Sequence, residues 1–321
     1  MSSIKKGCWE KRSLIKSIIL FSLTIFFWQL NLHSYSSPKR VVSLTVGSDE
    51  IVYDMLEMAG KKDKIAGLSS FANNRQFSNL DPAKISGFSF VGSHLESIVK
   101  LQPDLVIVAS YTSPDFLEKL EKLKIPTIKL DRFSSLSDIK ENIHLIGKRL
   151  GTAKEAKSLA AKIDLIKAIN LNAYRKEKRS ESTSKVNLAK DPSSVPSFMN
   201  APLKFAIYSP SGYIMGENTL ISDILRKMGF KNTVDISGWP KLSDEAISKL
   251  TPDFIVTSGE IHEKEKIMGA MLKHPGWKNV SAVKEKKVAF VPNRLLSATS
   301  HYTYETYLHL KNALEKLVIE K

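Results

Sequence analysis

Aromatic and basic side chains follow the short apolar runs of this 321-residue sequence. Runs such as "AGLSS", "IVAS", "KFAI" and "AFVP" are typical of buried β-strands. Residues that directly follow parallel strands meet at one edge of a sheet, where α/β proteins bind small molecules. Aromatic rings there suit a flat macrocycle or a catecholate, and guanidinium groups suit carboxylates or a phosphate. The candidate ligand-binding residues are Phe71, Arg75, Tyr111, Tyr208, Tyr213, Trp239, Arg294 and His301.

Trp239 is the strongest of these candidates, because it stands between Gly238 and Pro240 and therefore on a loop. Local packing explains any single aromatic residue about equally well. His301, with Tyr302 beside it, could offer an axial ligand to a haem iron, although a capping role at the surface is the simpler explanation. One histidine does not make a zinc site, which needs several ligands.

The pattern E-x-I-x-K-L-x-P-D occurs twice, beginning at Glu96 and at Glu245, and an apolar run follows each copy. In each copy the proline ends a helix and a strand begins. Ser93 and Glu96 fit a capping box, and an acidic residue in a first helical turn stabilises the helix by about 0.3–1 kcal/mol. Helix chemistry is therefore one explanation of the two glutamates.

Apolar runs alternate with helical patterns along most of the chain, which predicts an α/β fold. "PDLVIVAS" is a continuous apolar run, as expected for a central parallel strand that is covered on both faces. Ser48 can cap a helix that Gly60 ends, and "SLSDIKENIHLIGKRLG" predicts a helix that ends at Gly151. Because the alternation restarts at Leu203, we expect two Rossmann-like lobes, each with a parallel sheet.

The stretch 152–179 contains no Gly or Pro, and its apolar residues Leu159, Ile163, Ile166 and Ile169 keep helical spacing. It predicts a single long backbone helix, about 40 Å in length at 1.5 Å per residue, that joins the lobes. The Ser- and Pro-rich stretch after it predicts a flexible insert that the fold does not need. The expected domains are a signal peptide at 1–36, an N-terminal lobe at 38–151, the bridging helix at 152–179, the insert at 180–202 and a C-terminal lobe at 203–321.

The first 36 residues resemble an export signal. A basic stretch precedes the apolar run "SIILFSLTIFFWQL", which is shorter than the roughly 20 residues of a spanning helix. Small residues at Ser34, Ser36 and Ser37 suit a signal peptidase, so we expect cleavage near Ser36 or Ser37 and a periplasmic protein. An uncleaved membrane anchor is the alternative. The only cysteine, Cys8, precedes the apolar run, whereas a lipoprotein cysteine would follow it.

The bulk composition is that of an ordinary globular protein, with 42% hydrophobic and 25% charged residues. The formal net charge of +15 favours anionic partners. The lysines are dispersed, however, and export argues against nucleic acid as the partner. Without Cys8 the exported chain would hold no cysteine, which excludes disulfides, thiol chemistry and thiolate metal sites.

The segments "RVVSLTVGSDEIVYDMLEMAG", "KIAGLSSF" and "VGSHLESIVKLQPDLVIVAS" resemble the N-terminal lobe of periplasmic binding proteins for cobalamin, ferric siderophores and haem. "GWPKLSDEAISKLTPDFIVTSG" resembles the matching part of their C-terminal lobe. The resemblance implies two lobes bridged by one long helix and a metal chelate held between them. It also implies that Glu96 and Glu245, one on each lobe, dock onto arginines of an ABC-transporter permease. A monomer without a cofactor or resident metal is expected.

Three other classes of protein were weighed. A Rossmann-like enzyme would need a nucleotide loop or a nucleophile, and the sequence contains no G-x-G-x-x-G, no G-x-x-x-x-G-K-[ST] and no G-x-S-x-G. A zinc or manganese binding protein of the same architecture would need several histidine and carboxylate ligands. A membrane-anchored adhesin of this fold stays open if the N-terminus is not cleaved. The sequence does not identify the chelate, but "SSFANNRQF" lacks the D-Y-P common in cobalamin-type members.

Overall fold

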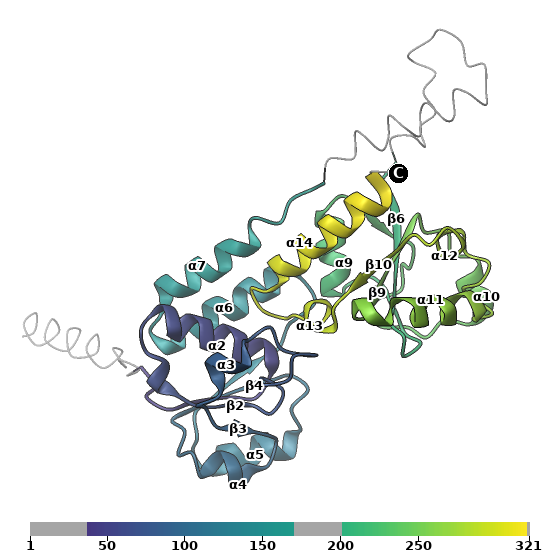
Figure 1. The fold of residues 1–321 in the computed structure, drawn as a ribbon. Coiled ribbons are helices and arrows are strands. Elements are labelled where there is room, and N and C mark those ends of the chain that lie inside the picture. Colours follow the sequence, from purple (N-terminus) through teal and green to yellow (C-terminus); the bar gives the residue numbers. More distant parts are fainter. Residues whose placement is uncertain (1–36, 170–200, 320–321) are drawn as a thin grey trace, which may run out of the picture. The chain divides into compact units, whose positions relative to one another are not determined.

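The computed structural model describes residues 37–169 and 201–319, which contain two β-sheets (Figure 1). The first sheet has the strand order β3-β2-β1-β4-β5, and every neighbouring pair is parallel. Each crossover between parallel strands therefore passes through helical or loop segments on the faces of the sheet. The strands are β1 (Val41–Ser43), β2 (Ile65–Ser69), β3 (Phe90–Val91), β4 (Leu105–Ala109) and β5 (Thr127–Leu130).

The second sheet has the order β10-β9-β6-β7, with β8 also paired to β6. Strands β8, β9 and β10 run parallel to their neighbours, but β7 is antiparallel to β6. The second sheet is therefore mainly parallel, as expected, and becomes mixed at β7, because a short turn containing Gly212 at φ +89° joins β6 directly to β7. The strands are β6 (Lys204–Tyr208), β7 (Ile214–Met215), β8 (Lys231–Asn232), β9 (Phe254–Ser258) and β10 (Val288–Val291).

Helices cover both faces of each sheet. In Figure 1, α2, α6 and α7 lie on one side of the first sheet, and α4 and α5 lie on the other. The helices of the first lobe are α2 (Val46–Met58), α3 (Pro82–Ile85), α4 (Leu95–Val99), α5 (Pro114–Lys122), α6 (Leu136–Leu150) and α7 (Ala153–Ile163), with a 3₁₀ turn η1 at Lys62–Lys64. Those of the second lobe are α9 (Leu220–Lys227), α10 (Asp244–Ser248), α11 (Lys264–Lys273), α12 (Ser281–Lys284), α13 (Asn293–Leu296) and α14 (Thr303–Leu314), with short helical segments η4 at Ile261–Glu263 and η5 at Glu315–Ile319. None of these described helices combines the length and the apolar character needed to cross a membrane.

The main apolar core runs through both lobes. Val41, Leu105 and Ile107 of the first sheet belong to the same buried cluster as Phe205 and Phe254 of the second. The alternate residues of the strands point to a second, smaller cluster on the opposite face of each sheet. By its contacts the chain from Pro38 to Lys321 is accordingly one compact unit. The lobe boundaries at 38–151 and 203–321 stay a prediction.

The expected long bridging helix is not formed as predicted. Helix α7 ends at Ile163, and residues 166–169 have no regular secondary structure. Ile166 and Ile169 are buried in the main core, and the Ile169 amide donates a hydrogen bond of 3.0 Å to the Met228 carbonyl after α9. Packing on the second lobe therefore replaces the helical hydrogen bonds that local spacing predicted. Residues 170–179, most of the expected insert at 180–202 and the expected signal peptide at 1–36 lie outside the described residues.

Two helix starts also differ from their predictions. Thr45, and not Ser48, is the N-cap of α2, because Ser48 lies inside the first turn and the Thr45 side chain accepts from the Ser48 amide. Helix α4 begins after His94 without a side-chain cap, so the expected capping box of Ser93 and Glu96 is absent. The stop at Gly151 is confirmed, since this residue ends α6 with φ +69° in the left-handed region.

Candidate ligand-binding site

A cavity of about 850 Å³ lies where the strand ends of both sheets meet. Ser110 and Asp131 follow β4 and β5 of the first sheet, and Ser209 and Ser258 stand at the ends of β6 and β9 of the second. The segment from Asn293 to Thr299, after β10, completes the wall. The cavity therefore occupies the carboxyl edge of the sheets, where α/β proteins bind small molecules.

Aromatic rings gather at this cavity in two packed pairs and one isolated residue. Phe77 and Phe133 line the cavity, as does Trp239. Phe71, a predicted ligand-binding residue, packs edge-on against Phe77 with ring centroids 5.6 Å apart. Tyr111, another predicted ligand-binding residue, has its ring centroid 6.4 Å from that of Phe133. Phe71 and Tyr111 are exposed, so both are placed to extend an apolar wall around a bound ligand.

Backbone hydrogen bonds fix the loop that carries Trp239, while the Trp239 side chain stays half exposed. Amide–carbonyl bonds of 2.9 Å (Gly216 to Gly238) and 2.8 Å (Gly238 to Glu217) join its loop to the segment after β7. These two segments of the chain approach so closely that a Cβ on Gly216 would stand 1.7 Å from the Ile236 carbonyl oxygen. Only glycine fits at that position. The backbone therefore presents the Trp239 ring, 55% exposed, at the cavity without burying it.

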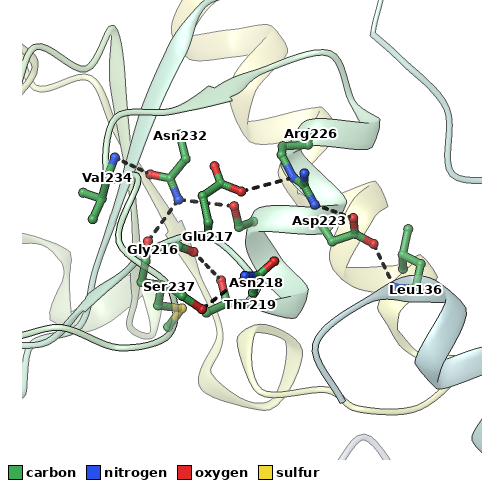
Figure 2. A network of polar contacts seen from close by, with 12 residues as sticks. Leu136, Gly216, Glu217, Asn218, Thr219, Asp223, Arg226, Asn232, Val234 and Ser237 are labelled. Atoms are coloured by element: carbon green, nitrogen blue, oxygen red, sulfur yellow. Dashed lines mark hydrogen bonds and ion pairs between the residues drawn. The ribbon is translucent and has the colours of Figure 1, made fainter. Parts of the chain in front are cut away.

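Polar side chains beside this loop form the network shown in Figure 2. The Asn218 amide donates to Ser237 Oγ at 3.2 Å, and Thr219 Oγ1 donates to the Gly216 carbonyl at 2.9 Å; both residues line the cavity. Arg226 contacts Asp223 at 2.9 Å, and Asp223 also accepts from the Leu136 amide at 2.9 Å. The carboxylate oxygen of Asp223 that does not contact Arg226 thus caps α6 of the first lobe. This hydrogen bond connects the second lobe to the first beside the cavity.

Two predicted ligand-binding residues lie elsewhere. Tyr208 is buried in the core of the second lobe, where its ring packs on Trp277 at 5.2 Å. His301 is fully buried, and its Nε2 lies 2.7 Å from the Asp54 carboxylate. Neither side chain is among the described residues that line the cavity, because inward alternation along β6 buries Tyr208 and a partner from the first lobe buries His301. Their assignment as ligand-binding residues stays a prediction. The expected surface capping role of His301 is wrong.

The other three predicted residues lie outside the cavity lining and have nearby partners. Arg75 is exposed and lies 3.4 Å from the Asp81 carboxylate. The Lys241 ammonium stands 4.8 Å from the centre of the Tyr213 ring. Arg294 lies 4.0 Å from a carboxylate oxygen of Glu260. Sequence reasoning missed Phe77 and Phe133, although Phe133 follows β5 just as Tyr111 follows β4.

The lobes also meet along one face of α2. Gly47 approaches Thr299 so closely that a Cβ would stand 2.2 Å from Thr299 Oγ1. One turn later Glu50 accepts a hydrogen bond of 2.5 Å from Ser300. The Asp54 contact with His301 continues this face, which has the spacing of neighbouring helical turns. A run of three consecutive residues of the second lobe therefore docks on three turns of α2.

The same helix buries two carboxyl groups. Burial raises the pKa of Asp49 to about 8 and that of Glu50 to about 7. Hydrogen bonds oppose this rise, since Asp49 accepts from Ser69 Oγ at 2.5 Å and Glu50 accepts from the Asn79 amide at 2.8 Å. Loss of hydration of the charged form is the larger effect, so Asp49 retains its proton through neutral pH and Glu50 retains its proton up to about pH 7.

Ionisation of Asp49 and Glu50 is expected to lower the free energy of unfolding as the pH rises from about 4 to about 8. The unfolded chain releases both protons near pH 4, whereas the folded chain holds them up to the raised pKa values. Their contribution is therefore fully present below about pH 4 and is lost as the pH approaches 8. Asp49→Asn should unfold at higher urea concentration than the parent at pH 8 and lose that advantage at pH 4. The exposed Asp63→Asn is the control, and an equal pH slope for parent and Asp49→Asn would contradict the expectation.

Glu96 and Glu245 occupy equivalent places in the two lobes. Each is exposed and stands in the first turn of a short helix, α4 or α10, that leads into an interior strand, β4 or β9. Glu245 pairs with Lys249 one turn on, at 2.6 Å. Ser243 caps α10 by accepting from the Ala246 amide. Neither glutamate side chain acts as a cap, which removes the capping explanation for both.

Within residues 37–169 and 201–319, no group of three or more histidine, cysteine, aspartate or glutamate side chains is placed to hold a metal ion.

Comparisons with known proteins agree with this geometry. The model of a family described as "Periplasmic binding protein" matches residues 41–295. An uncharacterized ABC transporter substrate-binding lipoprotein of Bacillus subtilis, YvrC, is 28% identical over 260 residues, which are 78% of this chain and 72% of that protein. A cobalamin-binding protein of Halobacterium salinarum is 24% identical over 227 residues, 69% of this chain but only 54% of that protein. The periplasmic heme-binding protein RhuT of Roseiflexus sp. RS-1 has the same fold, with a TM-score of 0.64 at 19% identity over 87% of this chain and 99% of that one.

Proposed function

Because the chain belongs to the periplasmic binding protein family, we propose that it captures a metal chelate in the cavity between its lobes and delivers it to the permease of an ABC importer. Proteins of this family bind and do not catalyse, so the chain is a binding protein and not an enzyme. The observation that carries the proposal is the cavity itself, which joins the strand ends of both sheets and is lined by Phe77, Phe133 and Trp239. Flat aromatic walls suit a large, partly apolar cargo.

The chelate class is supported by the names of related proteins. A relative with 24% identity is a cobalamin-binding protein, and a protein of the same fold binds haem. A relative with 28% identity is named as the substrate-binding component of an ABC transporter. We therefore propose cobalamin, a ferric siderophore or haem as the cargo and a permease as the macromolecular partner of a monomeric carrier.

The chain is an extracytoplasmic binding protein, as its family indicates. We further propose that residues 1–36 are cleaved during export and that the carrier is free in the periplasm. The place of Cys8 before the apolar run argues against a lipid anchor, although the Bacillus subtilis relative is a lipoprotein. The mass of the N-terminal peptide, together with the distribution of the protein between membrane and soluble fractions, decides between cleavage and anchoring.

Direct titration tests the proposed function. Trp239 lies at the cavity and is half exposed, so a bound chelate should quench its fluorescence. The exported protein is titrated with haem, cobalamin and ferric siderophores while tryptophan emission and ligand absorbance are recorded. We expect at least one chelate to bind with a Kd of about 1 μM or tighter, or roughly −8 kcal/mol. If none of these chelates binds, the proposed function is wrong.

A further inference from the structure

We propose that the cargo carries no net negative charge and that its own donors fully ligate its metal; this inference rests on the proposed function. It starts from the chemistry of the cavity wall. Among the described residues that line the cavity there is no lysine, arginine or histidine. Asp131 alone of these described lining residues has a charged side chain, a carboxylate. An anionic cargo would lose hydration on entry and face the Asp131 carboxylate, and no cationic side chain among the described lining residues would receive it.

Basic residues next to the lining already contact carboxylates. Lys129 lies 3.2 Å from Asp131 itself. Arg132 contacts both Asp138 and Glu141 on α6. Arg294, beside the lining residue Asn293, faces Glu260. Recruiting any of these cations to an anion would leave a carboxylate unpaired, so the net positive charge of the chain is not focused on this cavity.

Hydroxyl and amide groups supply the polar part of the wall instead. Eight of the lining residues are serine or threonine, and two are asparagine. Neutral groups of this kind donate and accept hydrogen bonds without favouring an anion. They match a cargo that is rich in amides or in hydroxamate oxygens and has no free carboxylates. Asn218 and Ser237 already bond to each other and so present a fixed pair to the cavity (Figure 2).

Met215 is the one described lining residue of a type that commonly ligates haem iron, and its side chain is buried. No histidine, tyrosine or cysteine is among the described lining residues. His301 and Tyr208 are buried elsewhere, and the His301 ring contacts Asp54. Tyr111 packs on the lining residue Phe133, with ring centroids 6.4 Å apart, and is not itself among the described lining residues. A chelate that is coordinatively complete needs none of these ligands.

Chelates of different charge test the inference on the exported full chain. The probes are cyanocobalamin and ferrichrome, which are uncharged, ferrioxamine B, which is cationic, and haemin and ferric enterobactin, which are anionic. We expect an uncharged or cationic probe to bind at least about 10-fold more tightly than either anion at physiological salt, because like charges repel within the cavity. The affinity of an uncharged probe should change little between low and high salt. Tightest binding of haemin or ferric enterobactin overturns the inference while the proposed function survives. Binding of no probe overturns the proposed function and the inference with it.

Two variants separate charge from general damage. Asp131→Asn should strengthen haemin binding and weaken ferrioxamine B binding, whereas the exposed Asp115→Asn on α5 should alter neither. No probe should show an iron–phenolate absorbance band on binding, because no phenolate ligand is required. An Asp131→Asn variant that treats both probes like the parent would contradict the inference. So would an iron–phenolate absorbance band that disappears in Tyr111→Phe.

Discussion

Replacing both Glu96 and Glu245 by lysine is expected to reduce uptake by the cognate permease to the level measured without the binding protein. Both carboxylates are exposed and lie in equivalent first turns of α4 and α10, one in each lobe. A permease with two-fold symmetry would offer each lobe the same basic socket, and lysine would set like charges against it. The double alanine variant should fall between the parent and the double lysine variant. Uptake into vesicles that contain the reconstituted permease is the measurement.

Controls for this prediction come from other exposed glutamates. Glu118 on α5 and Glu265 on α11 are surface residues, and replacing both by lysine changes the net charge equally. That variant should retain uptake. The Glu96 and Glu245 variants should bind chelate normally and lose at most about 0.5 kcal/mol of stability, since Glu245 makes only a surface ion pair. Normal uptake by the double lysine variant would show that the repeated pattern is helix chemistry alone.

Local patterns were sufficient to predict most strands and some helix ends. β4 was predicted because "PDLVIVAS" is apolar without interruption, and all five of its residues are buried. The stop of α6 at Gly151 was predicted because glycine adopts the left-handed region without strain. Each of these features depends on neighbouring residues only, so a single sequence carries the information.

Long-range contacts explain what could not be predicted. The spacing of Ile163, Ile166 and Ile169 continues a helical pattern, yet the last two are buried in the core that both lobes share, and their segment leaves the helix. The partner of His301, Asp54, is 247 residues away in the sequence. Periodicity reports that a residue is apolar or polar, but it does not say which distant element receives it.

The sequence predicted the location of the candidate site better than it predicted the residues that line it. The expectation that ligand meets the strand ends agrees with the cavity, and Trp239 lines it. The serine, threonine and asparagine residues that make up much of the wall were missed, because such residues on loops are ordinary in any sequence. Their importance follows only from the cavity that brings them together. Two of the predicted ligand-binding residues, Arg294 and His301, instead face the carboxylates of Glu260 and Asp54.

Trp239 and Trp277 are expected to respond to alanine substitution in opposite ways. Trp239 is 55% exposed at the cavity, whereas Trp277 is fully buried beneath Tyr208. Trp239→Ala should weaken chelate binding by about 10- to 100-fold, the range of an aromatic anchor worth about 1.4–2.8 kcal/mol. It should leave stability nearly unchanged. Trp277→Ala should lower the free energy of unfolding by about 3–5 kcal/mol, because it opens a cavity in the core of the second lobe.

Urea unfolding and chelate titration of both variants measure the two effects separately. Trp277→Phe is the conservative companion, since it keeps an aromatic ring on Tyr208 and should recover part of the lost stability. Saturating chelate should raise the Tm of the parent more than that of Trp239→Ala, because binding to the folded state stabilises it in proportion to affinity. A Trp239→Ala variant that loses stability like Trp277→Ala, yet binds chelate as tightly as the parent, would place Trp239 in the fold and not in the site.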